Sequence, residues 1–125
     1  MSRVKFIIAA LAALFVSTLG AGAAKAQTVR LYNTRGQEIR SGNPFPLDRF
    51  ARGETCVVKV WNPDGWAYYD VVSRRGFEFG GWDFPNYTED RFQIPLDPNA
   101  DYMKVRVYNY SRWRWIEYGI PIGRK

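Results

Sequence analysis

The stretch DPNADYMKVRVYNYSRWRWIEY, residues 97–118, determines the fold class that we expect for this chain. A polar turn opens it, and from Met103 onward apolar residues alternate with polar or charged ones. A period of two is typical of a strand with one buried face. The chain is expected to turn near residues 109–112 and to run back over 113–118. The stretch therefore predicts the central hairpin of a β domain.

Alternating segments also precede this hairpin, and turn residues separate them. The clearest strand covers residues 55–62, with Cys56 on its apolar face. The sequence NPDG, residues 62–65, has the composition of a type I turn. We therefore expect the chain to reverse there and to return as a partner strand over residues 66–73.

Proline interrupts the segments that follow. Residues 83–91, DFPNYTEDR, are polar and are expected to form a loop. Residues 92–96 alternate again, and Pro95 assigns this strand to the edge of a sheet. We therefore predict an all-β fold for a single domain over residues 27–125, a small antiparallel β-sandwich of about seven to eight short strands.

The residues Asn99-Ala100-Asp101-Tyr102 precede an alternating strand and resemble the tyrosine corner of immunoglobulin-like sandwiches. In those domains, a tyrosine hydroxyl tethers the loop that enters the strand. The resemblance implies an immunoglobulin-like architecture in which Tyr102 has this role. The family pattern also has a cysteine two residues after the tyrosine, where this chain has Lys104. The resemblance implies no function.

Residues 1–26 have the layout of a secretory signal peptide. Arg3 and Lys5 give a positive start, residues 6–19 are apolar, and AKA at 24–26 fits an A-x-A cleavage site. An uncleaved anchor is the alternative, although the apolar run is shorter than the roughly 20 residues that span a bilayer. We expect a protein exported to the periplasm or secreted, with no stable membrane insertion after cleavage.

The net charge is only mildly basic once this leader is removed. Without Arg3, Lys5 and Lys25, the 18 cations become 15 against 12 acids, a net charge of +3. Nucleic-acid-binding domains usually carry a denser positive charge, so no nucleic acid partner is predicted. Most of the cations are arginines, whose planar guanidinium stacks on aromatic rings and pairs with anions through two hydrogen bonds.

The chain lacks the residues that most enzymes use. It has no histidine, and Cys56 is the only cysteine. Ser-His-Asp and Cys-His triads and ordinary zinc sites are therefore excluded. We expect Cys56 to be a buried, inert thiol, with an intermolecular disulfide as the alternative. A glycosidase with two carboxylates is the enzyme class that stays open. We predict a non-enzymatic protein without a cofactor.

Asp97, Asn99 and Asp101 place oxygen side chains at alternate positions, as calcium loops do at their start. The later positions depart from the EF-hand pattern, with Tyr102 in place of glycine and Tyr108 in place of glutamate. An Asx-rich turn between strands is the other interpretation. Both interpretations stay open at this point, and no metal site is predicted.

The run RWRW at residues 112–115 is the strongest candidate for a binding site. In one interpretation the tryptophans fill the core and the arginines are solvated. In the other, the residues form a surface on which aromatic rings stack on sugars while arginines contact anionic groups. We expect a polysaccharide or acidic envelope polymer as the ligand; the alternative is a protein partner that pairs with an edge strand such as 92–96. The candidate ligand-binding residues are Trp61, Tyr108, Arg112, Trp113, Arg114 and Trp115, joined on outward strand faces by Arg30, Tyr32, Lys59 and Arg106.

Overall fold

A computed structural model describes residues 26–40 and 48–123 of the chain. The predicted signal peptide, apart from its last residue, lies outside these residues. The described part is all-β. In chain order its strands are β1 (Thr28–Tyr32), β2 (Thr55–Ser73), β3 (Gly76–Gln93), β4 (Lys104–Asn109) and β5 (Arg114–Gly119).

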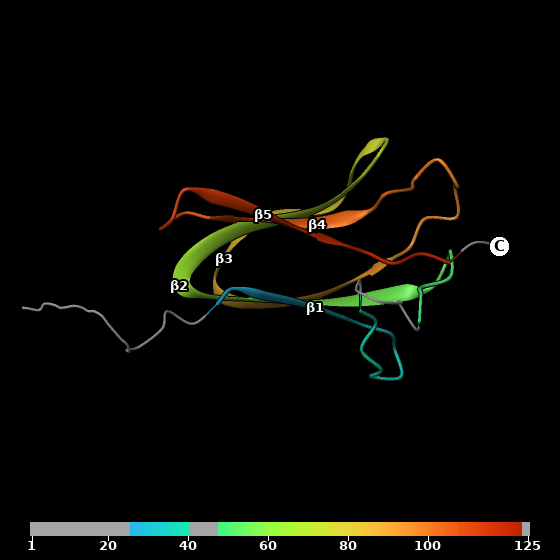
Figure 1. Cartoon of the computed structure of the whole chain (residues 1–125), viewed down its shortest axis with the longest axis horizontal. Helices are drawn as coiled ribbons and strands as arrows, with labels where there is room; N and C mark the ends of the chain where they lie inside the picture. The colour runs from blue at the N-terminus through green and yellow to red at the C-terminus, as the bar shows by residue number, and fades with distance from the viewer. Residues whose placement is uncertain (1–25, 41–47, 124–125) are drawn as a thin grey trace, which may run out of the picture.

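The long antiparallel hairpin of β2 and β3 organises a single sheet that curls over on itself (Figure 1). Trp61 is paired with Tyr87 and Trp66 with Pro85, so residues 62–65 of β2 lie opposite one residue of β3, Asn86. Extra residues on one strand bend it and increase its twist. Both long strands therefore turn a corner here and continue into a second half of the sheet.

The two halves of the curled sheet have different neighbours. β1 pairs with the first half of β2, from Val57 to Trp61. β4 pairs with the second half, from Ala67 to Val72, and β5 pairs with β4. We name them the β1 half and the β4–β5 half. In Figure 1 they face each other across the core.

The core consists of the side chains that the strands direct between the halves. Cys56, Val58 and Val60 are fully buried from one half, and Val105 and Val107 from the other. Burying a valine side chain contributes about 1.5–3 kcal/mol, so these alternating positions account for much of the stability. The expected burial of the Cys56 thiol is confirmed, and desolvation raises its pKa to about 12.

The prediction of seven or eight short strands is wrong for the described residues, which form five. Residues 62–65 do not end a strand as the expected type I turn would, because β4 and β1 pair with β2 on either side of them. Residues 83–91 are strand, not loop. Pro85 is tolerated in β3 because this strand has β2 as its one partner among the described strands, and edge strands accommodate proline.

The expected strand over residues 92–96 is also wrong. β3 ends at Gln93, and Ile94 continues as a buried segment whose amide donates to the carbonyl of Glu54 at 2.8 Å. The central hairpin is confirmed with a shift of one residue, since β5 begins at Arg114.

The immunoglobulin-like arrangement is not confirmed. β2 and β3 pass through both halves of one sheet, whereas an immunoglobulin sandwich divides its strands between two sheets. The expected role of Tyr102 is wrong. Its side chain is 74% exposed, and its ring lies against the Arg74 guanidinium at 4.3 Å.

Candidate functional site: the aromatic face

Aromatic side chains gather on the outer surface of the β4–β5 half. Tyr68 is the cross-strand partner of Tyr108, which is in turn the partner of Trp115. Cross-strand partners project from the same side of a sheet, so the three rings lie in a row. The Trp115 ring centroid is 5.1 Å from that of Tyr108 and 5.8 Å from that of Tyr68.

Two more rings extend this row. Trp66 precedes the buried Ala67, so alternation places it on the same side as Tyr68, and it is 57% exposed. Tyr110 packs edge-on against Tyr108 at 5.2 Å and is 45% exposed. We call this surface the aromatic face; it consists of Trp66, Tyr68, Tyr108, Tyr110 and Trp115.

Arg106 holds the centre of the aromatic face in position. Its guanidinium donates Nε–H to Oδ1 of Asp70 at 2.8 Å and Nη2–H to Oδ2 at 2.6 Å. Tyr68 donates its hydroxyl to the same Oδ2 at 2.8 Å, and Asp70 is only 2% exposed. The guanidinium also lies over the Trp115 ring, 4.9 Å from its centroid. Arg106 is therefore a positioning residue whose charge is already paired.

These contacts also raise the pKa values of Arg106 and Tyr68. Hydrogen bonding to Asp70 raises the pKa of the Arg106 guanidinium, which keeps it charged. Burial, followed by the hydrogen bond to Asp70, raises the pKa of the Tyr68 phenol. The tyrosine therefore acts as a neutral donor in this network, and the ring under Trp115 does not change charge near neutral pH.

The acidic residue Asp83 borders the aromatic face beside Tyr110. Tyr110 donates its hydroxyl to Oδ1 of Asp83 at 2.7 Å, and Asp83 is the cross-strand partner of Tyr68. The sequence prediction missed Asp83 because residues 83–91 were expected to form a loop. The available signal was the alternation of Trp82 and Phe84 around it, which a strand would have explained.

Arg112 holds the turn that joins β4 and β5, so its guanidinium is not presented to a ligand. Its Nε–H donates to Oδ2 of Asp64 at 2.6 Å, and Ser111 donates its hydroxyl to the Asp64 carbonyl at 3.0 Å. The hydrogen bond from Arg112 holds the pKa of the partly exposed Asp64 carboxyl below its ordinary value. Trp113, with φ of 54°, occupies this turn and is 83% exposed.

The structure brings only part of the predicted site together. Tyr108 and Trp115 contact each other, and both tryptophans of the RWRW run are exposed, so the core interpretation is wrong. Arg114 is paired in register with the buried Asn109, one residue from Trp115, so it lies on the opposite side of β5. Arg114 and Trp115 of β5 therefore do not form one surface.

Trp61 belongs to a separate surface on the β1 half. It packs against Tyr87 at 5.3 Å and lines a groove of about 140 Å³ together with Thr28, Arg30 and Lys59. Because β2 turns its corner between Trp61 and Trp66, the outer surfaces of the two halves face away from each other (Figure 1). The single predicted surface is thus divided; we call this second part the Trp61 face.

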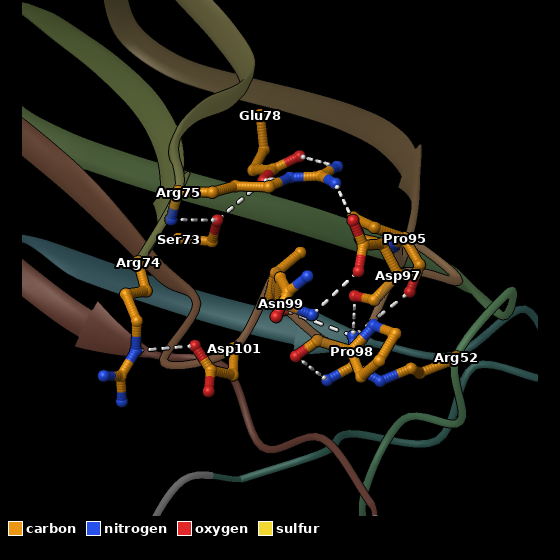
Figure 2. Close-up of polar contacts among 11 residues, drawn as sticks. Arg52, Ser73, Arg74, Arg75, Glu78, Pro95, Asp97, Pro98, Asn99 and Asp101 are labelled. Carbon is orange, nitrogen blue, oxygen red and sulfur yellow. Dashed lines mark hydrogen bonds and ion pairs between the residues drawn. The ribbon is translucent and has the colours of Figure 1, made fainter.

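Arginine guanidinium groups donate hydrogen bonds to oxygens of the possible calcium loop (Figure 2). Arg52 donates to the backbone carbonyls of Pro95, Asp97, Pro98 and Ala100 at 2.9–3.4 Å. The Asp97 carboxylate accepts the backbone N–H of Asn99 at 2.9 Å through Oδ1, which is an Asx-turn.

Two further carboxylate oxygens of this loop also accept hydrogen bonds. Oδ2 of Asp97 accepts Nη1–H of Arg75 at 2.8 Å, and Asp101 accepts Nε–H of Arg74 at 2.9 Å. No group of three acidic or cysteine side chains in residues 26–40 and 48–123 is placed to hold a metal ion. The contacts support the Asx-turn interpretation.

No protein-family model matches the chain, and no solved structure matches it significantly. The described residues contain no helix that is long and apolar enough to cross a membrane. Inference about function therefore rests on the surfaces described above.

Proposed function

We propose that the chain is an exported, non-enzymatic binding domain that holds a polysaccharide on its aromatic face. The signal-peptide pattern of residues 1–26 supports export. The two facing halves of the sheet act as the layers of a sandwich-like scaffold. The binding surface itself is a row of rings from three adjacent strands.

The carrying observation is the exposed Trp115 ring, fixed between Tyr108, Tyr68 and Arg106. Sugar rings present C–H groups on their faces, and these stack on the electron-rich face of an aromatic ring. Strands hold such rings more rigidly than loops do, so less side-chain entropy is lost when a ligand binds. A row of rings also suits a chain of sugars better than a single small molecule.

The test compares Trp115→Ala with Trp61→Ala by affinity electrophoresis in gels that contain soluble, uncharged polysaccharides. The pair is matched because each tryptophan is 49% exposed and each packs on a tyrosine. Losing a stacking ring costs about 1–3 kcal/mol in related stacking sites, so Trp115→Ala is expected to weaken binding at least about fivefold. Trp61→Ala is expected to bind as the unmodified protein does.

Trp115→Phe controls for the fold, because phenylalanine keeps a ring over Arg106. It should retain most of the binding, and thermal unfolding should show all three variants folded. Equal loss in the two alanine variants, or no retardation by any polysaccharide, would contradict the proposal.

A second candidate is protein binding through β3. This strand has one partner, β2, among the described strands, so a long free edge of unpaired backbone groups is available for strand addition. A second copy of the chain is the simplest partner. Sedimentation over a wide concentration range tests this: self-pairing through β3 gives a concentration-dependent dimer, and a constant monomer contradicts it.

A further inference from the structure

We infer that the aromatic face selects uncharged glycans over acidic ones and that Asp83 accepts the hydrogen bonds of their hydroxyl groups. This inference rests on the proposed function and specifies its substrate class. It runs against the expectation from composition, because an arginine-rich chain suggests an acidic ligand. Three observations about charge lead to it.

First, the arginines near the aromatic face are committed to other partners. Arg106 is paired with Asp70 through two hydrogen bonds. Arg112, in the turn between β4 and β5, is paired with Asp64 in the bend of β2. Arg114 lies on the other side of β5 from Trp115. A guanidinium keeps unused donors in such a pair, but the carboxylate already offsets most of its charge, so an incoming anion gains less attraction from it.

Second, the next cation along the outer surface is also paired. Lys104 follows the same alternation as Arg106, and its ammonium lies 2.9 Å from Oε1 of Glu117. An acidic polymer on this face would therefore have to displace an existing carboxylate before gaining an ion pair. Such an exchange yields little net free energy for exposed groups.

Third, the face presents a carboxylate with unused capacity. An ionised carboxylate can accept about four hydrogen bonds. Oδ1 of Asp83 accepts the Tyr110 hydroxyl at 2.7 Å, and Oδ2 accepts no hydrogen bond within the described part of the chain. Sugar hydroxyls are donors that this oxygen can take, whereas a uronate or sulfate beside Asp83 would be repelled.

The Trp61 face differs from the aromatic face in how its cations are paired, and it serves as the internal comparison. Arg30 and Lys59 line its groove, and their ion pairs are long, 3.8 Å to Glu38 and 3.9 Å to Glu89. An acidic polymer would find accessible cations there. Binding of an acidic polymer is therefore expected to depend on Trp61 and binding of an uncharged one on Trp115.

The experiment is isothermal titration of the folded protein with two uncharged polymers, laminarin and xyloglucan, and two acidic ones, alginate and polygalacturonate. At least one uncharged polymer should bind with an affinity that salt does not change. Binding that Trp115→Ala removes is assigned to the aromatic face. By this criterion, each acidic polymer should bind to the aromatic face at least about tenfold more weakly than the uncharged polymer does.

Two variants isolate the carboxylate. Asp83→Ala should weaken binding of the uncharged polymer at least about tenfold, because a hydrogen bond to a charged acceptor is lost. Tyr110→Phe removes the hydrogen bond between these residues but keeps the carboxylate, so its loss should be clearly smaller. Equal losses would mean that Asp83 only positions Tyr110, and the inference would be overturned.

The outcomes separate the two claims. One outcome would be that acidic polymers bind more tightly than uncharged ones, that this binding needs Trp115, and that Asp83→Ala strengthens it. In that case the proposed function stands and the inferred selectivity is wrong. If none of the four polymers binds in a manner sensitive to Trp115→Ala, the proposed function fails and the selectivity fails with it.

Discussion

Asn109 donates a side-chain hydrogen bond to Oδ1 of Asn62 at 3.1 Å, although the two residues are 47 positions apart and both are buried. The Asn62 side chain also donates to the carbonyl of Gly65 at 2.9 Å, inside the bend of β2. Oδ1 of Asn109 accepts the backbone N–H of Ser111 at 3.0 Å, in the turn after β4. The pair therefore joins the bend that curls the sheet to the turn beside the aromatic face.

Replacement of Asn62 by alanine is expected to lower the free energy of unfolding by about 1–3 kcal/mol, because buried donors and acceptors lose their partners. Urea denaturation measures this. Asn99→Ala is the matched control, since Asn99 is exposed and a surface change of this kind has an effect of about 0.5 kcal/mol or less. Similar losses in both variants would show that the buried pair does not stabilise the bend.

The ion pair of Arg106 and Asp70 predicts unequal effects for its two partners. Arg106→Leu leaves a buried carboxylate without its cation, and this is expected to cost about 3–5 kcal/mol. Asp70→Ala should cost less, because the side chain of Arg106 is 33% exposed and its guanidinium can turn to water. Chemical denaturation of both variants measures the difference.

The double variant Asp70→Leu with Arg106→Leu provides the check on this explanation. It removes both charges, so it should recover part of the stability that Arg106→Leu alone loses. A double variant less stable than Arg106→Leu would argue that the packing of the arginine, rather than the uncompensated carboxylate, causes the loss.

Arg52 is predicted to organise the segment between β3 and β4, because its guanidinium donates to four carbonyls there. Arg52→Met keeps the length of the side chain and should cost about 1–3 kcal/mol, with faster amide hydrogen exchange at Ala100. Arg49→Met is the control, because Arg49 is exposed and makes no side-chain hydrogen bond within the described residues. If both variants exchange alike, the loop is held by its own turns.

Glu78 predicts a loss of stability in acid. Its pKa lies below the ordinary 4.5, chiefly because Arg75 donates a hydrogen bond to its carboxylate at 2.7 Å, and the hydroxyl of Ser73 adds another (Figure 2). A carboxyl with a lowered pKa in the folded state stabilises fully above its unfolded pKa, and the contribution is lost as the pH falls through the folded pKa.

The urea midpoint of the unmodified protein should therefore fall more between pH 6 and pH 3 than that of Glu78→Gln, because the amide does not titrate. At pH 6 the variant should be the less stable of the two. Parallel pH profiles for the two proteins would mean that the hydrogen bonds to Glu78 contribute nothing to stability.

The sequence predicted local burial well. Alternation correctly assigned Cys56 and Val105 to the core, and the return strand expected over 113–118 is present from Arg114 onward. It failed at residues 62–65 and 83–91, where proline and glycine suggested that strands end. Turn residues also fit a wide bulge, and only pairing with β1 and β4 on either side reveals that β2 continues.

Only part of the candidate site was predicted, because it too depends on where turns lie and how strands pair. Trp115 is exposed because the register of β5 pairs it with Tyr108 on the outer side of the sheet, and Trp113 is exposed because it lies in the turn. The role of Arg112 was not predictable, since its partner Asp64 lies 48 positions away in the bend of β2. Asp83 was missed because its position depends on the register of β3 against Tyr68.

The sequence by itself determined that this chain is all-β and which side of most strands is apolar, because the pleat alternates side chains over neighbouring residues wherever a strand forms. Only the tertiary structure decided that the five strands of residues 26–40 and 48–123 form one curled sheet and that Trp61 and Trp115 lie on opposite halves of it. It also decided which arginines are paired. These properties depend on contacts between residues far apart in the chain, which a local pattern of residue types does not encode.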